Sequence, residues 1–251
     1  MEARFRITGQ EVGVSMNATV ATPRDEFKEA TRSLTSVLAP LEKRTLIWLA
    51  HRMPYWVNSD HLTGLALIAM LLAGLSYWLA SVTPVGLLLV VVFLAVNWFG
   101  DSLDGTLARV RCHQRPRYGF YVDHIVDAFG ALFLLGGLGL SGHMSPFVAL
   151  ALLVAYLLLL VESFLATQTL GKFKMSYFKV GPTELRILLA IGNLVLLVHP
   201  TADVFGREYR LFDVGGVVAT CGLLFTLAFA TVTNTLALYA AEPLPGRTAR
   251  R

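Results

Sequence analysis

Long apolar runs recur along the chain, and they constrain its fold more than any other feature of the sequence. Most of them approach or exceed the roughly 20 residues that a helix needs to cross a bilayer. Hydrophobic residues make up 55% of the chain and charged residues only 15%, which is too apolar for a soluble domain of this size. We therefore expect an all-α integral membrane protein with six transmembrane helices. The six runs lie at about residues 62–80, 83–108, 120–141, 146–168, 183–199 and 213–241.

The stretch LEKRTLIWLAHRMPYWV, at residues 41–57, precedes the first run and alternates basic with apolar side chains. That pattern is typical of an amphipathic helix lying in the membrane interface, and Pro54 is expected to end it. The chain thus divides into a polar N-terminal segment at 1–40, a membrane domain at 41–241 and a basic tail at 242–251. The N-terminal segment is polar and unpatterned, so we expect it to be mobile.

Basic residues divide unevenly among the segments that flank the runs, and this predicts the orientation. Of the 21 Lys and Arg residues, 19 fall before the first run, around the second and fourth connections, or after the last run. The other two, Arg207 and Arg210, lie between the fifth and sixth runs. Because cytoplasmic segments carry the excess of basic residues, both termini are expected in the cytoplasm. The formal net charge of +4 fits basic loops beside anionic lipid, and we expect no nucleic-acid partner.

Two carboxylates stand at the cytoplasmic end of the second run, where residues 99–109 read FGDSLDGTLAR. On a helix, this stretch presents one narrow face of acidic and small residues. That face consists of Asp101, Asp104, Gly105 and Ala108. Counted from the start of the run at about 1.5 Å per residue, Asp101 lies near the cytoplasmic edge of the hydrocarbon core.

A second pair of carboxylates opens the third run, where residues 119–127 read GFYVDHIVD. Gly119, Asp123 and Asp127 recur at intervals of four residues and therefore share one face. The short connection makes the two helices antiparallel, so the two acidic pairs are expected to meet. Four carboxylates at low dielectric repel one another unless cations neutralise them. Oxygen-only ligands favour Mg²⁺ or Mn²⁺, and four carboxylates suit two metal ions.

Ordinary helix caps and interfacial charges are the first alternative explanation of these aspartates. An aspartate near a helix start, such as Asp123, often only interacts with the helix dipole. Asp101 and Asp104 lie toward the wrong end of their helix for that role. A divalent-cation transporter is a second alternative, but transport carboxylates usually lie near the midplane, and here they cluster at one membrane face. A catalytically silent scaffold is a third alternative, and the presence of all four aspartates speaks against it.

At these residues the sequence resembles the CDP-alcohol phosphotransferase family. The signature of that family is Asp-x-x-Asp-Gly-x-x-Ala-Arg, a short spacer, and Gly-x-x-x-Asp-x-x-x-Asp. All eight fixed positions are present in DSLDGTLAR at 101–109 and GFYVDHIVD at 119–127. The spacer between them has nine residues, one more than is most common in the family. The resemblance extends over most of residues 40–241, because it includes the six runs and the amphipathic stretch before them.

The resemblance implies a metal-dependent enzyme of phospholipid synthesis. Such an enzyme transfers a substituted phosphate from a CDP-alcohol to a hydroxyl acceptor, releases CMP, and uses Mg²⁺ or Mn²⁺, here with two ions expected. The resemblance also implies a homodimer among membrane lipids. CDP-diacylglycerol is the favoured donor because the chain is small and has one catalytic unit. A CDP-choline or CDP-ethanolamine donor with diacylglycerol as acceptor stays open, since both branches of the family share the motif.

The resemblance further assigns roles to the residues of the motif. Asp101, Asp104 and Asp123 would hold the metal ions. Asp127 would complete the metal site and act as the catalytic base for the incoming hydroxyl. Small residues would let the nucleotide lie against the helices, and an arginine would neutralise its phosphate. The residues implied to bind nucleotide are Asp104, Gly105, Ala108, Arg109 and Gly119.

Basic residues near the start of the fifth run give a weaker signal, in the stretch FKMSYFKVGPTELRILL. Lys179 and Arg186 lie on the expected cytoplasmic side and are candidates to bind the phosphate of a lipid or of a phosphorylated acceptor. Pro182 and Glu184 equally suit an ordinary helix start, beside basic residues that only follow the cytoplasmic bias.

Two polar residues inside the runs have open roles. Asn97 precedes Asp101 by one helical turn, and it could support that carboxylate or bond a neighbouring helix. Glu162 in the fourth run is a functional candidate, as intramembrane acids are, or it reaches the interface or a neighbouring helix.

Overall fold

Helices account for most of the chain in the computed structural model, which describes residues 39–170 and 182–244. Most of the expected N-terminal segment and basic tail lie outside the described residues, and so does Lys179. The described part contains seven helices and one two-stranded hairpin. In chain order these elements are α1 (Ala39–Arg52), α2 (Ser59–Ala80), α3 (Val85–Val110), α4 (Pro116–Leu140), α5 (Pro146–Leu170), α6 (Pro182–Leu196), β1 (Thr201–Val204), β2 (Arg207–Arg210) and α7 (Leu211–Ala241).

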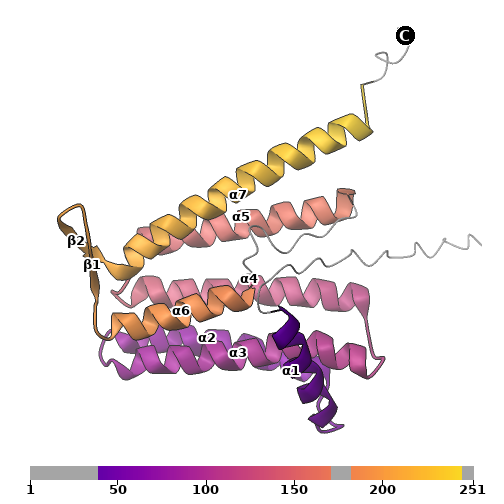
Figure 1. Ribbon diagram of the computed structural model, residues 1–251, viewed down its shortest axis with the longest axis horizontal. Helices are drawn as coiled ribbons and strands as arrows, with labels where there is room; N and C mark the ends of the chain where they lie inside the picture. The colour runs from indigo at the N-terminus through magenta and orange to yellow at the C-terminus, as the bar shows by residue number, and fades with distance from the viewer. Residues whose placement is uncertain (1–38, 171–181, 245–251) are drawn as a thin grey trace, which may run out of the picture.

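Helices α2 to α7 run roughly side by side as a bundle, and α1 lies across one end of it (Figure 1). We call the end with the α3–α4 connection the motif end, and the end with β1 and β2 the hairpin end. Helix α2 packs against both α3 and α4, and α5 packs against α4 and α7. Helix α6 packs against α3 and begins well short of the motif end (Figure 1).

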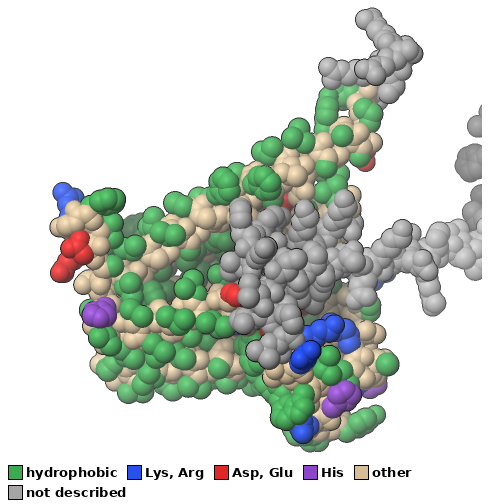
Figure 2. Space-filling view, viewed as in Figure 1, with side chains coloured by type: hydrophobic (Ala, Val, Ile, Leu, Met, Phe, Trp, Pro, Cys, Tyr) green, Lys and Arg blue, Asp and Glu red, His purple; other side chains and the backbone are tan. Residues whose placement is uncertain are grey.

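Five helices are long and apolar enough to cross a bilayer by length and composition, namely α2, α3, α4, α5 and α7. Figure 2 shows hydrophobic side chains over the body of the bundle, with charged side chains mostly at its two ends. These features agree with the predicted helical membrane protein. The predicted run at 183–199 forms α6, which has 15 residues and ends at Leu196. It is about 22 Å long, shorter than a ~30 Å hydrocarbon core, so the count of six spans stays a prediction.

Helices α2 and α4 approach closely because glycines face each other. A Cβ atom added to Gly137 would lie 2.1 Å from the Gly74 carbonyl oxygen. A Cβ atom added to Gly74 would lie 2.2 Å from the Phe133 carbonyl oxygen. The absence of side chains therefore lets the two backbones meet. The buried core beside this contact includes Tyr77, Val90, Leu134 and Leu138.

The turn between α1 and α2 is closed by a residue from a different part of the chain. Helix α1 ends at Arg52, and Pro54 follows, as expected for a residue that disfavours helix before it. Arg111, just after α3, donates to the carbonyl oxygens of Met53 and Pro54 at 2.9 and 3.0 Å. It also donates to the carbonyl oxygen of Val57. Arg111 therefore has a structural role that a count of basic loop residues does not reveal. Whether α1 lies in a membrane interface stays a prediction.

A short hairpin joins α6 to α7, and the expectation of an all-α chain did not include it. Strand β1 pairs antiparallel with β2, from Thr201 opposite Arg210 to Val204 opposite Arg207. Between the strands, Phe205 and Gly206 have φ angles of 53° and 77°. Positive φ at both positions is typical of a tight hairpin turn, and Gly adopts it without strain. The sequence lacks the usual Asn-Gly signal because Phe stands at the first of these positions.

We predict that Gly137→Ala destabilises the bundle, whereas Gly136→Ala does not. The two glycines are adjacent on α4, but a Cβ atom at Gly136 meets nothing within 4 Å. The clash at Gly137 is with backbone, so we expect a loss on the order of 3 kcal/mol. Thermal unfolding of the purified variants in detergent measures the difference. Equal midpoints for the two variants would contradict the described packing of α2 on α4.

Candidate active site

The four aspartates of the motif lie on two helices that run in opposite directions from the motif end. Helix α3 carries Asp101 and Asp104 in its C-terminal half, and α4 carries Asp123 and Asp127 in its N-terminal half. The carboxylate of Asp127 is repelled by the other three and attracted by Arg186. The fold therefore brings all four carboxylates within electrostatic range of one another. Tyr156 of α5 lies within the same range of Asp127.

Arg186 of α6 balances part of this negative charge. Its Nη2 atom donates to Oδ2 of Asp101 at 2.6 Å, and the two side chains are only 16% and 23% exposed. A charge-assisted hydrogen bond in such a shielded place holds both side chains firmly. Removing either partner would leave the other charge poorly compensated. Of the two basic residues that the sequence singled out, Arg186 therefore lies at the aspartates, and Lys179 lies outside the described residues.

Asp104 is held by neutral donors rather than by a cation. Thr63 of α2 donates its hydroxyl to Oδ2 of Asp104 at 2.5 Å. The backbone N–H of Gly105 donates to the other carboxylate oxygen. Helix α2, which packs against both α3 and α4, therefore also orients one side chain of the motif.

The chemistry of these side chains fits a hard divalent cation. Four carboxylates within electrostatic range of one another offer only oxygen ligands, and the site is partly shielded. Within residues 39–170 and 182–244, no three Asp, Glu, His or Cys side chains converge as ligands of one metal ion. Asp101 is turned to Arg186 and Asp104 to Thr63. The donor set thus fits Mg²⁺ or Mn²⁺, and these two side chains would have to turn to bind it.

Two glycines of the motif have no packing role among the described residues. A Cβ atom on Gly105 would meet nothing closer than Nη1 of Arg109 at 3.4 Å, and one on Gly119 would meet nothing within 4 Å. By contrast, a Cβ atom on Gly100 would lie 2.6 Å from the Leu62 carbonyl oxygen. Helix packing explains Gly100, but among the described residues no backbone packs against Gly105 or Gly119. A ligand lying against the helices would explain why side chains are absent there.

Ala108 and Arg109 continue the face that Gly105 begins. Ala108 is half-buried, and Arg109 is exposed at the end of α3. The Nη2 atom of Arg109 donates to the Thr106 hydroxyl at 3.1 Å, which folds the side chain back along the helix. The guanidinium therefore stands over the open surface at Gly105, where it can meet the phosphate of a ligand.

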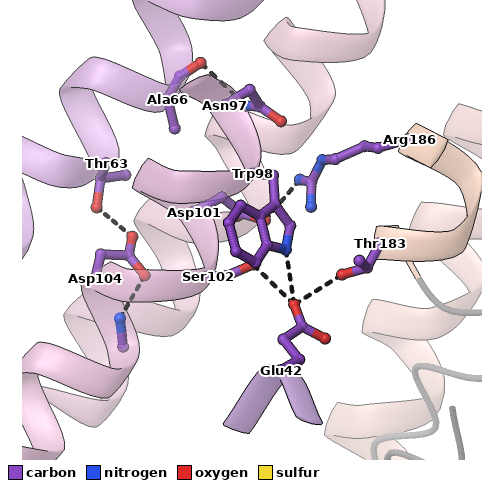
Figure 3. Close-up of polar contacts among 11 residues, drawn as sticks. Glu42, Thr63, Ala66, Asn97, Trp98, Asp101, Ser102, Asp104, Thr183 and Arg186 are labelled. Carbon is purple, nitrogen blue, oxygen red and sulfur yellow. Dashed lines mark hydrogen bonds and ion pairs between the residues drawn. The ribbon is translucent and has the colours of Figure 1, made fainter. Parts of the chain in front are cut away.

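Several further residues join the site, and sequence patterns marked them weakly or not at all (Figure 3). Glu42 of α1 accepts hydrogen bonds from two residues of α3 and one of α6. A polar residue in an apolar run was the only signal for Thr63, and nothing marked the partners of Glu42. These further residues are Glu42, Thr63, Trp98, Ser102 and Thr183.

The two polar residues left open by the sequence both bond neighbouring helices. Asn97 donates through Nδ2 to the Ala66 carbonyl oxygen of α2 at 3.1 Å, and its Oδ1 atom is buried without a described partner. Oε1 of Glu162 accepts from Asn234 of α7 at 2.6 Å. Both side chains therefore join neighbouring helices, which is one of the two roles that the sequence left open for each residue.

A comparison with known families agrees with this arrangement. The family model described as CDP-alcohol phosphatidyltransferase matches residues 56–232, which is well over half of the chain and includes the whole motif. The chain belongs to this family. It is also similar to the inner membrane protein YnbA of Escherichia coli strain K12, with 26% identity over 170 residues. That alignment covers 64% of this chain and 77% of YnbA.

Family membership makes the protein a transferase of substituted phosphate groups, with a CDP-alcohol donor and an alcohol acceptor. That the nucleotide lies against Gly105 and Gly119 stays a prediction, which the lack of packed backbone at these glycines among the described residues makes testable. We predict that Gly105→Val folds normally but binds a CDP-alcohol about tenfold or more weakly, because the added side chain fills that space. Thermal unfolding and equilibrium titration with the nucleotide measure the two effects.

Gly136→Ala serves as the control, because a Cβ atom on Gly136 meets nothing within 4 Å and lies away from the motif. It should retain both stability and nucleotide affinity. A Gly105→Val variant that binds the CDP-alcohol as tightly as the unmodified protein would contradict a nucleotide site on this face.

Proposed function

We propose that this membrane transferase of phospholipid synthesis moves a phosphatidyl group from CDP-diacylglycerol to a hydroxyl acceptor and releases CMP, with Mg²⁺ or Mn²⁺ as cofactor. The observation that carries the proposal is the cluster of four aspartates beside two glycines against which no described backbone packs. Acid clusters of this kind suit phosphoryl transfer, because the charge of a pyrophosphate must be cancelled while its oxygens are held in line. CDP-choline or CDP-ethanolamine with diacylglycerol as acceptor is the alternative within the family.

Each residue of the motif has a role in the proposal. Asp101, Asp104, Asp123 and Asp127 would hold the metal ions, which supply positive charge to the pyrophosphate. Gly105, Ala108 and Gly119 leave space for the nucleotide, and Arg109 neutralises one of its phosphates. Asp127 accepts the proton of the attacking hydroxyl. The acceptor oxygen forms a bond to the phosphorus of the phosphatidyl group, and the bond from that phosphorus to the oxygen of CMP breaks.

The proposal also includes a membrane setting. We place six spans in the bilayer, with α6 as the short fifth span and α1 in the interface, and we place the motif end and both termini in the cytoplasm. The bias of 19 basic residues against two supports this orientation. The similarity to an inner membrane protein of Escherichia coli supports the inner membrane as its location. A site at the cytoplasmic edge suits a nucleotide that arrives from water and a lipid that arrives from the bilayer. Family resemblance supports a homodimer.

We predict that the purified protein releases CMP from CDP-diacylglycerol when Mn²⁺ or Mg²⁺ and a suitable alcohol are present. A panel of alcohols and sugar phosphates, tested in detergent and in liposomes, identifies the acceptor. Asp127→Asn should lower the rate by about a hundredfold or more, because an amide cannot accept the proton. Chelation with EDTA should abolish the release, and Mn²⁺ or Mg²⁺ should restore it.

Glu208→Gln is the control, because it removes a carboxylate that is exposed on β2 at the hairpin end. It should leave the rate unchanged. Release from CDP-choline or CDP-ethanolamine alone, with diacylglycerol as acceptor, would replace the favoured donor by the alternative. Absence of CMP release with every CDP-alcohol would refute the proposal and favour a transport or scaffold role.

Arg186 is also expected to affect the binding of the acceptor. We propose that Lys179 and Arg186 bind the phosphate of a lipid or of a phosphorylated acceptor. Arg186→Gln should then raise the KM for a phosphorylated acceptor about tenfold or more, while the KM for the donor changes little. Steady-state kinetics with each substrate varied in turn measures the two constants, with Arg207→Gln at the hairpin end as control. An unchanged acceptor KM after substitution of both Lys179 and Arg186 would exclude this role.

A further inference from the structure

One carboxylate from α1 joins three elements of the protein next to the aspartates. Oε1 of Glu42 accepts from the indole Nε1 of Trp98 at 2.9 Å and from the Ser102 hydroxyl at 3.3 Å, both on α3. The same oxygen accepts from the hydroxyl of Thr183 at 2.8 Å, in the first turn of α6. Figure 3 shows the three donors converging on Glu42. Helices α1, α3 and α6 therefore meet at a single oxygen atom.

The environment of Glu42 makes these contacts strong. The side chain is half-buried, and hydrogen bonds to an ionised acceptor are roughly twice as strong as those between neutral groups. Its negative charge also lies at the start of α6, where the unpaired backbone N–H groups favour an anion. Loss of this carboxylate would leave the Trp98 and Thr183 donors without this acceptor and remove the charge that complements the helix dipole.

The contact of Glu42 with α6 lies one turn from the ion pair of the aspartate site. Thr183 bonds Glu42, and Arg186, three residues later on the same helix, bonds Asp101. On α3, Ser102 bonds Glu42 and directly follows Asp101. The two links thus lie side by side between the same helices. A rotation or shift of the first turn of α6 would move Arg186 away from Asp101.

Helix α6 needs such an anchor because it is short and packs mainly against α3. At its other end, Asn193 donates to the Tyr77 hydroxyl of α2 at 2.8 Å, and Asn193 is fully buried. That contact fixes the half of α6 nearer the hairpin end. At the first turn, Thr183 donates to Glu42 of α1. The position of Arg186 therefore depends on a residue of α1.

We propose that Glu42 is a positioning residue that fixes the first turn of α6 and thereby holds Arg186 against Asp101. The role of Arg186 toward the acceptor rests on the proposed function, but the hold of Glu42 on α6 does not. Glu42 touches no reacting atom in this proposal, and it acts through Thr183 and α6. It would make helix α1, which carries no residue of the motif, part of the transferase site.

Amide hydrogen exchange, measured by mass spectrometry on the full-length protein, tests the hold on α6 without any assay of activity. Glu42→Ala and Thr183→Val should both speed exchange in the N-terminal half of α6 and leave exchange in α2 unchanged. Glu42→Gln keeps an oxygen that can accept all three hydrogen bonds but loses the charge, so its exchange in α6 should lie between that of Glu42→Ala and that of the unmodified protein. Lys43→Ala is the matched control on α1, because Lys43 is exposed. Unchanged exchange in α6 of Glu42→Ala would overturn the proposal.

A kinetic double-mutant cycle tests whether Glu42 acts through Arg186. Glu42→Ala should raise the acceptor KM about tenfold, Glu42→Gln should raise it less because it keeps the acceptor oxygen, and Lys43→Ala should have no effect. In an Arg186→Gln background, Glu42→Ala should cause no further loss, because the side chain that it positions is already gone. A purely structural role would give two independent losses that add, and that result would overturn the coupling to Arg186.

The two measurements separate this proposal from the proposed function. If no CDP-alcohol yields CMP but Glu42→Ala and Thr183→Val both speed exchange in α6, the proposed reaction fails and the hold of Glu42 on α6 stands. If CMP is released normally and exchange in α6 is unchanged in both variants, the reaction stands and the role of Glu42 fails.

Discussion

Repulsion among four carboxylates on α3 and α4 is the constraint on which the rest of the site depends. Charges of one sign cannot stay together at the edge of an apolar bundle unless neighbouring helices compensate them. Arg186 of α6 supplies a cation to Asp101, and Thr63 of α2 supplies a hydroxyl to Asp104. The motif lies on two helices, but its charges require groups from at least two more.

Glycines divide into two kinds in this protein, and the division separates fold from function. Gly74, Gly100 and Gly137 lie where an added Cβ atom would strike the backbone of a neighbouring helix. These glycines let the helix backbones approach closely, as small residues do in other membrane bundles that lack a hydrophobic driving force between helices. Gly105 and Gly119 meet no such backbone, so packing within the described chain gives no reason for them. Helical periodicity alone cannot separate these kinds, and in the sequence only the family motif singles out Gly105 and Gly119.

Local patterns in the sequence predicted the features that depend on residues close together in the chain. The apolar runs gave the positions of α2 to α7 to within a few residues, and the i, i+4 spacing gave the shared face of Asp123 and Asp127. The hairpin at 201–210 was missed because its turn uses Phe205, which no short pattern marks as a turn residue. The bonds of Glu42 were missed for a different reason. Its partners Trp98 and Thr183 are 56 and 141 residues away, and a contact at that separation leaves no periodic trace.

The difference between local motifs and contacts from distant helices also bears on which residues determine the acceptor specificity. The motif on α3 and α4 is common to both branches of the family, so it cannot decide between a polar alcohol and diacylglycerol. That choice must therefore lie in side chains that reach the aspartates from other helices. Among the described side chains that do so, Arg186 of α6 donates to Asp101, and Tyr156 of α5 lies within electrostatic range of Asp127. A guanidinium at that place favours an acceptor with a negative charge over a neutral lipid, because its second partner, after Asp101, would be an anion. If Arg186 binds the acceptor as proposed, the cation of α6, rather than the acids of the motif, is the part of the site that favours a phosphorylated acceptor.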